Sequence, residues 1–426
     1  MNTFSVSRLA MALAFGVTLT ACSSTPADQQ PSTQAAPGTA SRPILSAAEA
    51  KNFVQASYFS TLDANAAPWS PYDIRVPAKP DYVVGPAGTE GVTHTSIQAA
   101  VDAAITRHSG QRTYIAIMPG EYAGTVYVPA SPTSVTLYGL GDKPADVKIG
   151  AAIDSEIDPA SWRKLVNPGG KYMPGKPAWY MFDNCQSKRT ASVGMMCSAV
   201  FWSQNSGLQL QNLTIENNLG DSVDAGNHQA VALRSDGDKV QINKVNILGR
   251  QNTFFVTNSG VQNRLQANRI TRTLVTNSYL EGDVDIVSGR GAVVFDHTDF
   301  QVVNSRTQQE GYVFAPATPV SLNYGFLAVN SRFSAAGDGV AQLGRSLDID
   351  GSTNGQAVIR DSVINAGFNM AKPWADAAVS KRPFAGNTGA QNDKGEIERN
   401  LNDARFNRLW EYNNRGEGSR VVAEKK

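Results

Sequence analysis

The sequence is poor in the residues that build metal and redox centres. It contains 3 cysteines and 4 histidines among 426 residues, and no histidine falls into a metal-ligand spacing. Charge is balanced, with 38 basic and 37 acidic residues, and no lysine or arginine cluster reaches the density that nucleic-acid binding requires. The sequence therefore predicts no metal, no other cofactor and no nucleic-acid partner.

Long apolar runs are also scarce, and the one near the N-terminus is short. It extends from Leu9 to Val17, follows the basic residue Arg8 and leads to Cys22. Such a run is too short to span a membrane and is typical of a secretory signal peptide, here residues 1–21. Because a cysteine closes it, the segment resembles a bacterial lipobox with a lipid on Cys22, and Ser23 at the next position favours the outer membrane. The alternative is an ordinary signal peptide with a chance cysteine.

Cys185 and Cys197 are the other two cysteines. Both follow the export signal into an oxidising compartment, where a disulfide closing so short a loop is expected. Metal binding is the weaker alternative, because neither a histidine nor a second cysteine pair lies nearby in the sequence.

Composition divides the rest of the chain. Residues 22–43 are rich in proline, serine, threonine and glutamine, which predicts a flexible tether. A lead-in follows over residues 44–80. The main domain should occupy residues 81–418, with a short tail at residues 419–426, and we expect a monomer.

The main domain begins with one helix and continues as strands. Apolar residues at helical spacing predict an amphipathic helix from Ser96 to Arg107, and Tyr114–Met118 is typical of a buried strand. Six copies of a strand, polar turn and strand follow at intervals of 32, 33, 20, 33 and 31 residues. They align on the apolar positions Ile215, Ile247, Leu280, Phe300, Phe333 and Ile364, each three residues after the polar positions Asn212, Lys244, Asn277, His297, Asn330 and Asp361.

Short repeats of this kind cannot bury their apolar faces alone, so copies stack into a solenoid. The expected fold is all-β, a parallel β-helix with a capping helix and long side loops. A sandwich or propeller is disfavoured because Asn-Gly hairpin turns do not punctuate the units. Residues 151–198 and 365–400 break the rhythm and predict loop insertions. The aromatic residues of the first insertion either wall a binding groove or form a small core: Trp162, Tyr172, Trp179 and Tyr180.

The segment Glu281–Gly289 carries two carboxylates, Asp283 and Asp285. In a strand they would point to one face, with Cα atoms about 6.6 Å apart. A carboxylate held on a rigid strand suits a nucleophile or a general base. The alternative is an exposed strand face with solvated charge. Three further segments offer amide or guanidinium donors beside small residues: His228–Arg234, Gly249–Phe254 and Leu343–Arg345.

In order and spacing, these four segments resemble the signature blocks of the pectinesterases. The resemblance covers about residues 80–418 and includes three further segments: Thr95–Ala104, Pro119–Tyr122 and Trp410–Gly416. It implies a single-stranded, right-handed parallel β-helix of the pectin-lyase type. It also implies that Asp285 is the nucleophile, that Gln229 and Gln251 hold the oxyanion, and that Arg345 orients the nucleophile.

The sequence departs from the family pattern at the proton donor. Asn252 stands where the family has a second aspartate, and an amide cannot supply the proton in acid catalysis. Asp283 is the candidate substitute acid. An aromatic residue is also absent after the arginine block, where Ser346 and Leu347 follow, and Gly124 replaces a frequent glutamate.

Three functions follow from this pattern. The first is a carboxylic-ester hydrolase that acts through Asp285 on a polysaccharide ester of the cell envelope or outside it. The second is an acyl-CoA or other thioester hydrolase using the same residue, because a thiolate can leave without a proton. The third is a catalytically silent β-helix that binds glycan.

Overall fold

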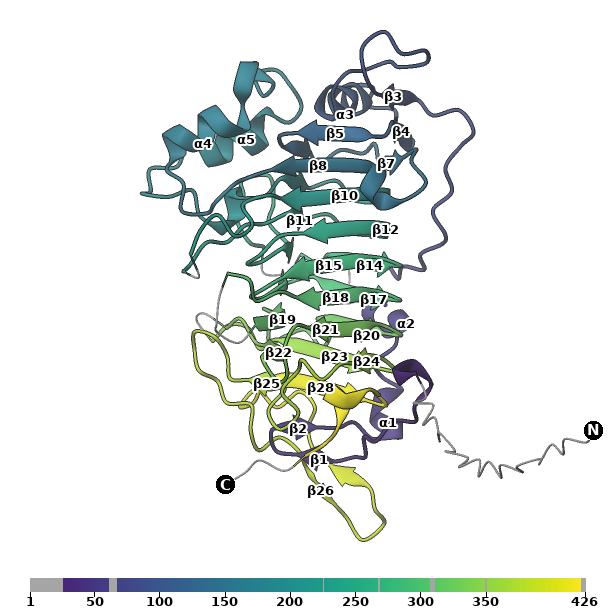
Figure 1. Ribbon diagram of the computed structural model, residues 1–426, viewed down its shortest axis with the longest axis vertical. Coiled ribbons are helices and arrows are strands. Elements are labelled where there is room, and N and C mark those ends of the chain that lie inside the picture. The colour runs from purple at the N-terminus through teal and green to yellow at the C-terminus, as the bar shows by residue number, and fades with distance from the viewer. Residues whose placement is uncertain are drawn as a thin grey trace, which may run out of the picture.

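A computed structural model describes residues 26–60, 67–224, 226–266, 269–306, 311–348 and 351–422 of the chain (Figure 1). The proposed signal peptide and Cys22 lie outside the described residues. The chain winds as a column of stacked coils, with the N-terminal coils at the top of Figure 1 and the C-terminal coils below. No helix in the described ranges is long and apolar enough to cross a membrane.

Two long parallel sheets form the column. The 16-stranded sheet contains β3 (Tyr82–Val84), β4 (Thr113–Ile117), β5 (Gly120–Ala123), β7 (Val135–Gly139), β8 (Val147–Ala151), β10 (Gln209–Asn217), β12 (Val240–Leu248), β14 (Arg272–Thr276), β15 (Tyr279–Gly282), β17 (Ala292–Asp296), β18 (Asp299–Val302), β20 (Phe326–Val329), β21 (Arg332–Ala335), β23 (Gln356–Arg360), β24 (Val363–Ile364) and β28 (Arg408–Tyr412). The 8-stranded sheet contains β6 (Val126–Val128), β9 (Phe201–Ser203), β11 (Leu233–Ser235), β13 (Phe254–Val256), β16 (Val287–Gly289), β19 (Gly311–Pro316), β22 (Ala341–Arg345) and β25 (Trp374–Ala375).

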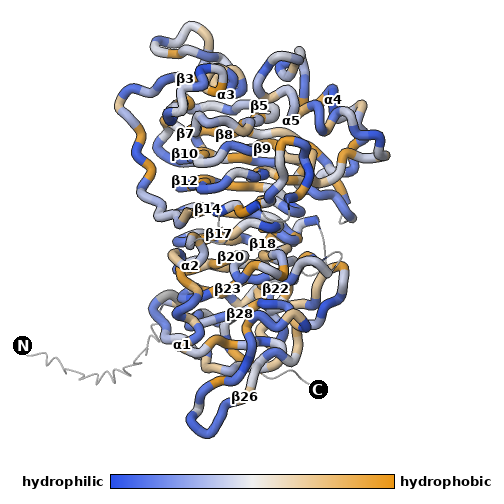
Figure 2. The backbone as a smooth tube through the Cα atoms, turned by 180° about the vertical axis from the view of Figure 1, so that it is seen from behind, coloured by the Kyte–Doolittle hydropathy of each residue, from blue (hydrophilic) through white to orange (hydrophobic). Residues whose placement is uncertain are grey.

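The remaining elements are short. Two antiparallel pairs are β1 (Gly38–Thr39) with β2 (Arg42–Pro43) and β26 (Ala390–Gln391) with β27 (Ile397–Glu398). The helices are α1 (Ala47–Ala50), α2 (Gln55–Phe59), α3 (Ile97–Thr106), α4 (Pro159–Val166) and α5 (Trp179–Gln186), with 3₁₀ helices η1 (Ala27–Gln29), η2 (Pro144–Asp146), η3 (Pro168–Gly170), η4 (Met195–Cys197) and η5 (Glu417–Ser419). The loop that joins β26 and β27 at the C-terminal end is mostly hydrophilic (Figure 2).

The predicted repeat sets the register of the large sheet. The six apolar positions pair in sequence, from Ile215 with Ile247 to Phe333 with Ile364, and all six side chains are buried. The six polar turn positions all have a positive φ between 50° and 54°. Asparagine and aspartate tolerate this left-handed conformation because their short polar side chains bond locally. Each coil therefore bends at the predicted residue.

The predicted helix and the segment before the β-helix cover different parts of the column. Helix α3 begins after Ser96, whose hydroxyl accepts from the Ala99 amide, and it caps the top end in Figure 1. Helices α1 and α2 lie along the side instead. Their apolar residues pack with Val294, Leu327, Val358 and Trp410 on the outer face of the large sheet.

The prediction of a flexible tether over residues 22–43 is wrong for its second half. The Gln34 amide donates to the Glu411 carboxylate at 2.8 Å, and Arg42 forms an ion pair of 2.9 Å with the same carboxylate. The Arg42 and Glu411 side chains are both fully buried. Composition could not reveal this attachment, because the partner lies more than 360 residues away in the sequence.

The insertion at residues 151–198 forms a small helical unit beside the column. Cys185 and Cys197 form the predicted disulfide, with an S–S distance of 2.08 Å. Trp162 and Tyr172 are buried and both stack on Phe182, so of the two alternatives these aromatics form the unit's own core. In the second insertion, residues 365–400, β25 continues the 8-stranded sheet by pairing with β22.

Candidate active site

The predicted site residues meet where strands of the 8-stranded sheet begin. Asn252 and Asp285 each lie two residues before a strand, β13 and β16, whose first residues pair with each other. Both have a left-handed backbone, with φ of 57° and 52°. The backbone N–H of Asn252 donates to the backbone carbonyl of Val284 at 3.0 Å. Asn252 therefore occupies the position of Asp285 in the neighbouring coil.

The prediction that Asp283 and Asp285 share one face of a strand is wrong. Both lie in the bend between β15 and β16, and the left-handed backbone at Asp285 breaks the alternation of a strand. Asp283 pairs with Arg306, with Nε–Oδ2 and Nη2–Oδ1 distances of 3.0 and 3.2 Å. Both of these side chains are at most 2% exposed. Because its carboxylate is enclosed by a guanidinium, Asp283 is poorly placed to serve as the substitute acid.

Asp285 pairs with a different arginine. Arg345, at the end of β22, donates from Nε and Nη2 to the two carboxylate oxygens at 2.9 and 3.0 Å. The guanidinium carbon also lies 4.1 Å from the centre of the Tyr312 ring. Burial lowers the pKa of Arg345, but pairing with Asp285 outweighs it and leaves the pKa above its usual value. A bidentate pair of this kind fixes the orientation of the carboxylate.

Two glutamine amides converge on a single oxygen beside this pair. Gln229 and Gln251 form a parallel bridge between neighbouring coils. Their Nε2 atoms donate to Oδ1 of Asn227 at 2.6 and 3.4 Å. The hydroxyl of Ser155 donates to Oε1 of Gln229 at 2.6 Å and so orients that amide. The Asn227 oxygen marks the place where an ester oxygen could receive both amide donors.

The side-chain amide of Asn252 acts as a hydrogen-bond donor. Its Nδ2 donates to the Ser288 hydroxyl at 2.9 Å, and the residue is 4% exposed. A neutral amide carries no proton that it can release at ordinary pH. The geometry therefore offers a nucleophile and oxyanion donors, but no acid at this position.

A polar hollow of about 350 Å³ extends from Arg345 over the C-terminal coils. It is lined by Tyr312, Gln342, Lys372 and Lys381 among others. Lys372 and Lys381 outnumber the one carboxylate among its lining residues, Asp376, and this positive excess favours anionic ligands. Within the described ranges, no group of three or more histidine, cysteine, aspartate or glutamate residues could hold a metal ion.

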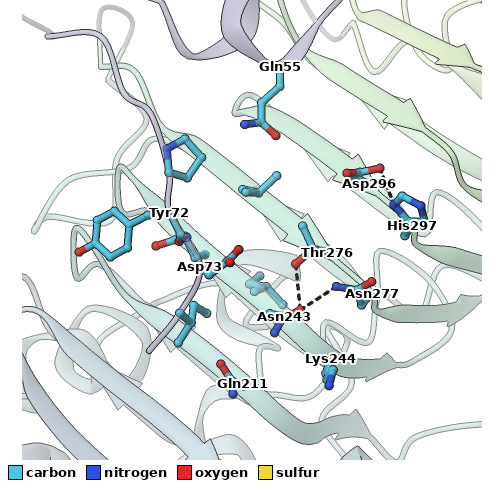
Figure 3. Close-up of a pocket in the computed structure, with 15 residues that line it drawn as sticks. Gln55, Tyr72, Asp73, Gln211, Asn243, Lys244, Thr276, Asn277, Asp296 and His297 are labelled. Carbon is cyan, nitrogen blue, oxygen red and sulfur yellow. Dashed lines mark hydrogen bonds and ion pairs between the residues drawn. The ribbon is translucent and has the colours of Figure 1, made fainter. Parts of the chain in front are cut away.

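A second hollow lies on the outer face of the 16-stranded sheet, beneath the lead-in segment (Figure 3). Its volume is about 420 Å³, and Tyr72, Asp73 and Lys244 are among its lining residues. The Asn243 oxygen accepts from the side chains of Thr276 and Asn277, both at 3.0 Å. Because this hollow contains none of the predicted site residues, we keep Asp285 as the centre of the candidate site.

Several residues of the site escaped the sequence analysis: Ser155, Asn227, Ser288, Arg306 and Tyr312. Ser155 belongs to the helical insertion, and Arg306 is 23 residues from its partner Asp283. Asn227 precedes the His228–Arg234 block by one residue, and Ser288 lies inside the Glu281–Gly289 segment, so each of these two had a local signal. The other contacts join separate coils, so local sequence patterns contain no trace of them.

The parallel β-helix holds a carboxylate–guanidinium pair and two convergent amides, an arrangement that suits an ester hydrolase. The family model "Pectinesterase" matches residues 184–347, a range that holds all five predicted catalytic positions. The chain is 47% identical to "Pectinesterase B" of Dickeya dadantii over 96% of its own length and 97% of that protein. The chain belongs to the pectinesterase family of hydrolases.

Two further relatives bear on fold and function. The chain is 75% identical over the full length of both proteins to the Escherichia coli protein named "Putative acyl-CoA thioester hydrolase YbhC". The crystal structure of YbhC matches with a TM-score of 0.90 over 92% of this chain and 99% of that one. The rice weevil pectin methyl esterase structure matches with a TM-score of 0.78 and 36% identity, over 91% of this chain and all of that one. These neighbours confirm the predicted right-handed parallel β-helix.

Proposed function

We propose that the protein hydrolyses a carboxylic ester carried by a polysaccharide of the cell envelope or outside the cell. The observation that carries the proposal is the pairing of Asp285 with Arg345 beside two amides aimed at one point. An Asp285 oxygen attacks the ester carbonyl carbon, and Gln229 and Gln251 hold the resulting oxyanion. Such donors are worth about 10² to 10³ each in rate.

Collapse of this intermediate expels the leaving group and leaves an anhydride between the acyl group and Asp285. Water then attacks the anhydride, which releases the carboxylic acid and restores the Asp285 carboxylate. Arg345 holds the carboxylate in the attacking orientation throughout. The leaving alkoxide takes its proton from solvent, because Asn252 has none to give.

The polar hollow beside Arg345 supports a charged polysaccharide as the carrier of the ester. Lys372 and Lys381 line it together with Arg345. Carboxylates on neighbouring sugar units would meet these ammonium groups. Methyl esters and acetyl esters of anionic polysaccharides are therefore the first substrates to assay, on wild type and on a variant without the Asp285 carboxylate.

A thioester is the second candidate, favoured by Asn252. An alkoxide needs a proton to leave, whereas a thiolate with a parent pKa near 8.5 does not. Loss of the general acid lowers the rate by about 10² to 10⁴ when the leaving group is an alkoxide, and by little when it is a thiolate. Thioester turnover that depends on Asp285 and exceeds methyl-ester and acetyl-ester turnover would replace the first proposal by this one. If no substrate shows turnover that depends on Asp285, the remaining function is that of a catalytically silent β-helix that binds glycan.

Asn227 gives a prediction for the free enzyme. Its exposed side chain occupies the point where the ester oxygen should bind, so substrate must displace two hydrogen bonds. We expect Asn227→Ala to raise kcat/KM by about threefold to tenfold, the equivalent of one neutral hydrogen bond. Asn392→Ala, which removes an exposed amide in the β26–β27 loop, should leave kcat/KM unchanged. A fall in kcat/KM for Asn227→Ala would show that this side chain assists binding instead.

We further propose that the protein is anchored to the outer membrane by a lipid on Cys22. The Pro-rich chain between Cys22 and Gln34, where packing on the β-helix begins, can span at most about 40 Å. Replacing Cys22 by alanine should move the protein from the membrane fraction to the soluble periplasmic fraction. Retention of this variant in washed membranes would contradict the lipid anchor.

A further inference from the structure

An apolar pocket of about 290 Å³ is lined by residues of the helical insertion and of the 8-stranded sheet. Its walls include the apolar residues Met195, Met196, Phe255, Leu265, Ala317 and Leu347. Arg290 is the one charged residue among the lining residues described. A cavity of about 150 Å³ can hold benzene, so this pocket has room for an aryl group or a short alkyl chain.

The residues that line the pocket are close in the strands to the proposed catalytic residues. Phe255 pairs with Ser288 in neighbouring strands, and Ser288 accepts the hydrogen bond from Asn252. Gly289, the residue after Ser288, lines the pocket. Leu347 follows Arg345 by two residues. Gly289 also follows Asp285 by four residues, so both members of the Asp285–Arg345 pair are near pocket-lining residues in the chain.

The protein holds this pocket in shape through the helical insertion. Met195 and Met196 belong to η4, which the disulfide at Cys197 ties to α5. The Met196 carbonyl also accepts from the buried guanidinium of Arg234, which stacks on Trp202 with its carbon 4.1 Å from the ring centre. A prebuilt apolar pocket binds its ligand without the entropic cost of forming the pocket.

We infer that this pocket binds an apolar group attached to the ester, so the substrate is an ester of a hydrocarbon-bearing acid or alcohol rather than a methyl ester. This inference rests on the proposed function of Asp285. It is consistent with the polar hollow that Arg345 lines, because an acylated polysaccharide carries both an apolar group and charged sugars. Methionine side chains adapt their shape, so chains of more than one form can fit.

Turnover of two ester series tests the inference. The acyl series consists of ethyl acetate, ethyl butyrate and ethyl hexanoate, and the alcohol series of methyl, butyl and hexyl acetate. We expect kcat/KM to rise by about threefold to fourfold for each methylene buried in one series, which identifies the side that the pocket serves. A flat response in both series, with Asp285-dependent turnover of every ester, would overturn the inference and leave the proposed function standing.

Variants locate the effect. Leu265→Ser and Leu347→Ser should each reduce the ratio of kcat/KM for the hexyl or hexanoate ester to that for the shortest ester. Leu140→Ser changes a leucine that is 49% exposed just after β7, far along the column, and should leave this ratio unchanged. Equal ratios in all three variants and the wild type would place the preference elsewhere on the molecule and overturn the inference.

Binding tests the pocket without turnover. In the Asp285→Asn protein, calorimetry with hexanamide, N-hexylacetamide and acetamide should show at least tenfold tighter binding of one hexyl compound than of acetamide. If the wild type turns over no ester, the proposed function fails. Tighter binding of a hexyl compound would still show that the pocket binds an apolar group. Equal affinity for the three amides would overturn the inference in either case.

Discussion

Asp285→Asn is expected to lower ester turnover by about 10⁴-fold or more, as removal of a nucleophile does in other hydrolases. The asparagine amide has nearly the shape of the carboxylate but cannot form the acyl intermediate. Arg345 keeps its contact with the Tyr312 ring, so the site should lose chemistry and little of its shape. Initial rates on the best ester or thioester, with a thermal melt of both proteins, measure the two effects separately.

Arg345→Lys is the companion to this variant. Lysine keeps the charge but cannot make two parallel hydrogen bonds to Asp285, so kcat should fall by about tenfold to 10²-fold. The expected change in melting temperature is small, because Arg345 lies at the end of β22 with 23% of its side chain exposed. Activity lost only in proportion to the unfolded fraction, in either variant, would reduce the Asp285–Arg345 pair to a structural ion pair.

Asn252→Asp is expected to raise methyl-ester hydrolysis by about 10²-fold or more, the usual contribution of a placed acid. Neighbouring coils of a parallel sheet lie about 4.8 Å apart, and Asn252 stands at the Asp285 position of the next coil. The negative charge of Asp285 disfavours a second charge there, so the pKa of the introduced carboxyl should be raised and its proton retained. Ser288 already provides a hydroxyl at that side chain.

The pH dependence distinguishes this acid from a general change in the site. Activity gained by Asn252→Asp should fall as the pH rises through the pKa of the introduced carboxyl, because the proton donor is then lost. The wild type should lack this descending limb, and thioester hydrolysis should change little in the variant. An equal gain on both substrate types, or a gain that grows with pH, would contradict proton donation at this position.

The repeat could be predicted from the sequence because it depends on residues that are only a few positions apart. Each coil needs an apolar residue in the core and, three residues before it, a residue that accepts a left-handed turn; Asn212 with Ile215 and Asn277 with Leu280 are examples. Stacking then follows, because neighbouring coils bury each other's apolar faces. Helix α3 and the disulfide were predicted for the same reason, from apolar spacing in one case and from a short cysteine separation in the other.

The positions of the candidate site were also predictable, but their pairing was not. Sequence resemblance placed Asp285, Gln229, Gln251, Asn252 and Arg345, and the structure brings these residues together. The strand geometry assumed for Asp283 failed because the bend before β16 turns it toward Arg306. A hydrophobic pattern describes alternation along a strand and contains nothing about a left-handed residue that interrupts it.

By itself the sequence determined the coil, the cap, the disulfide and the kinds of side chain that line the site. Only the tertiary structure decided that Asn227 occupies the point where Gln229 and Gln251 converge, that Arg42 is buried against Glu411, and that two methionines of the helical insertion close an apolar pocket beside Ser288. Coil formation depends on residues a few positions apart, which a sequence displays directly. The other contacts join residues from different coils or from opposite ends of the chain, and their distances are fixed only when the coils stack.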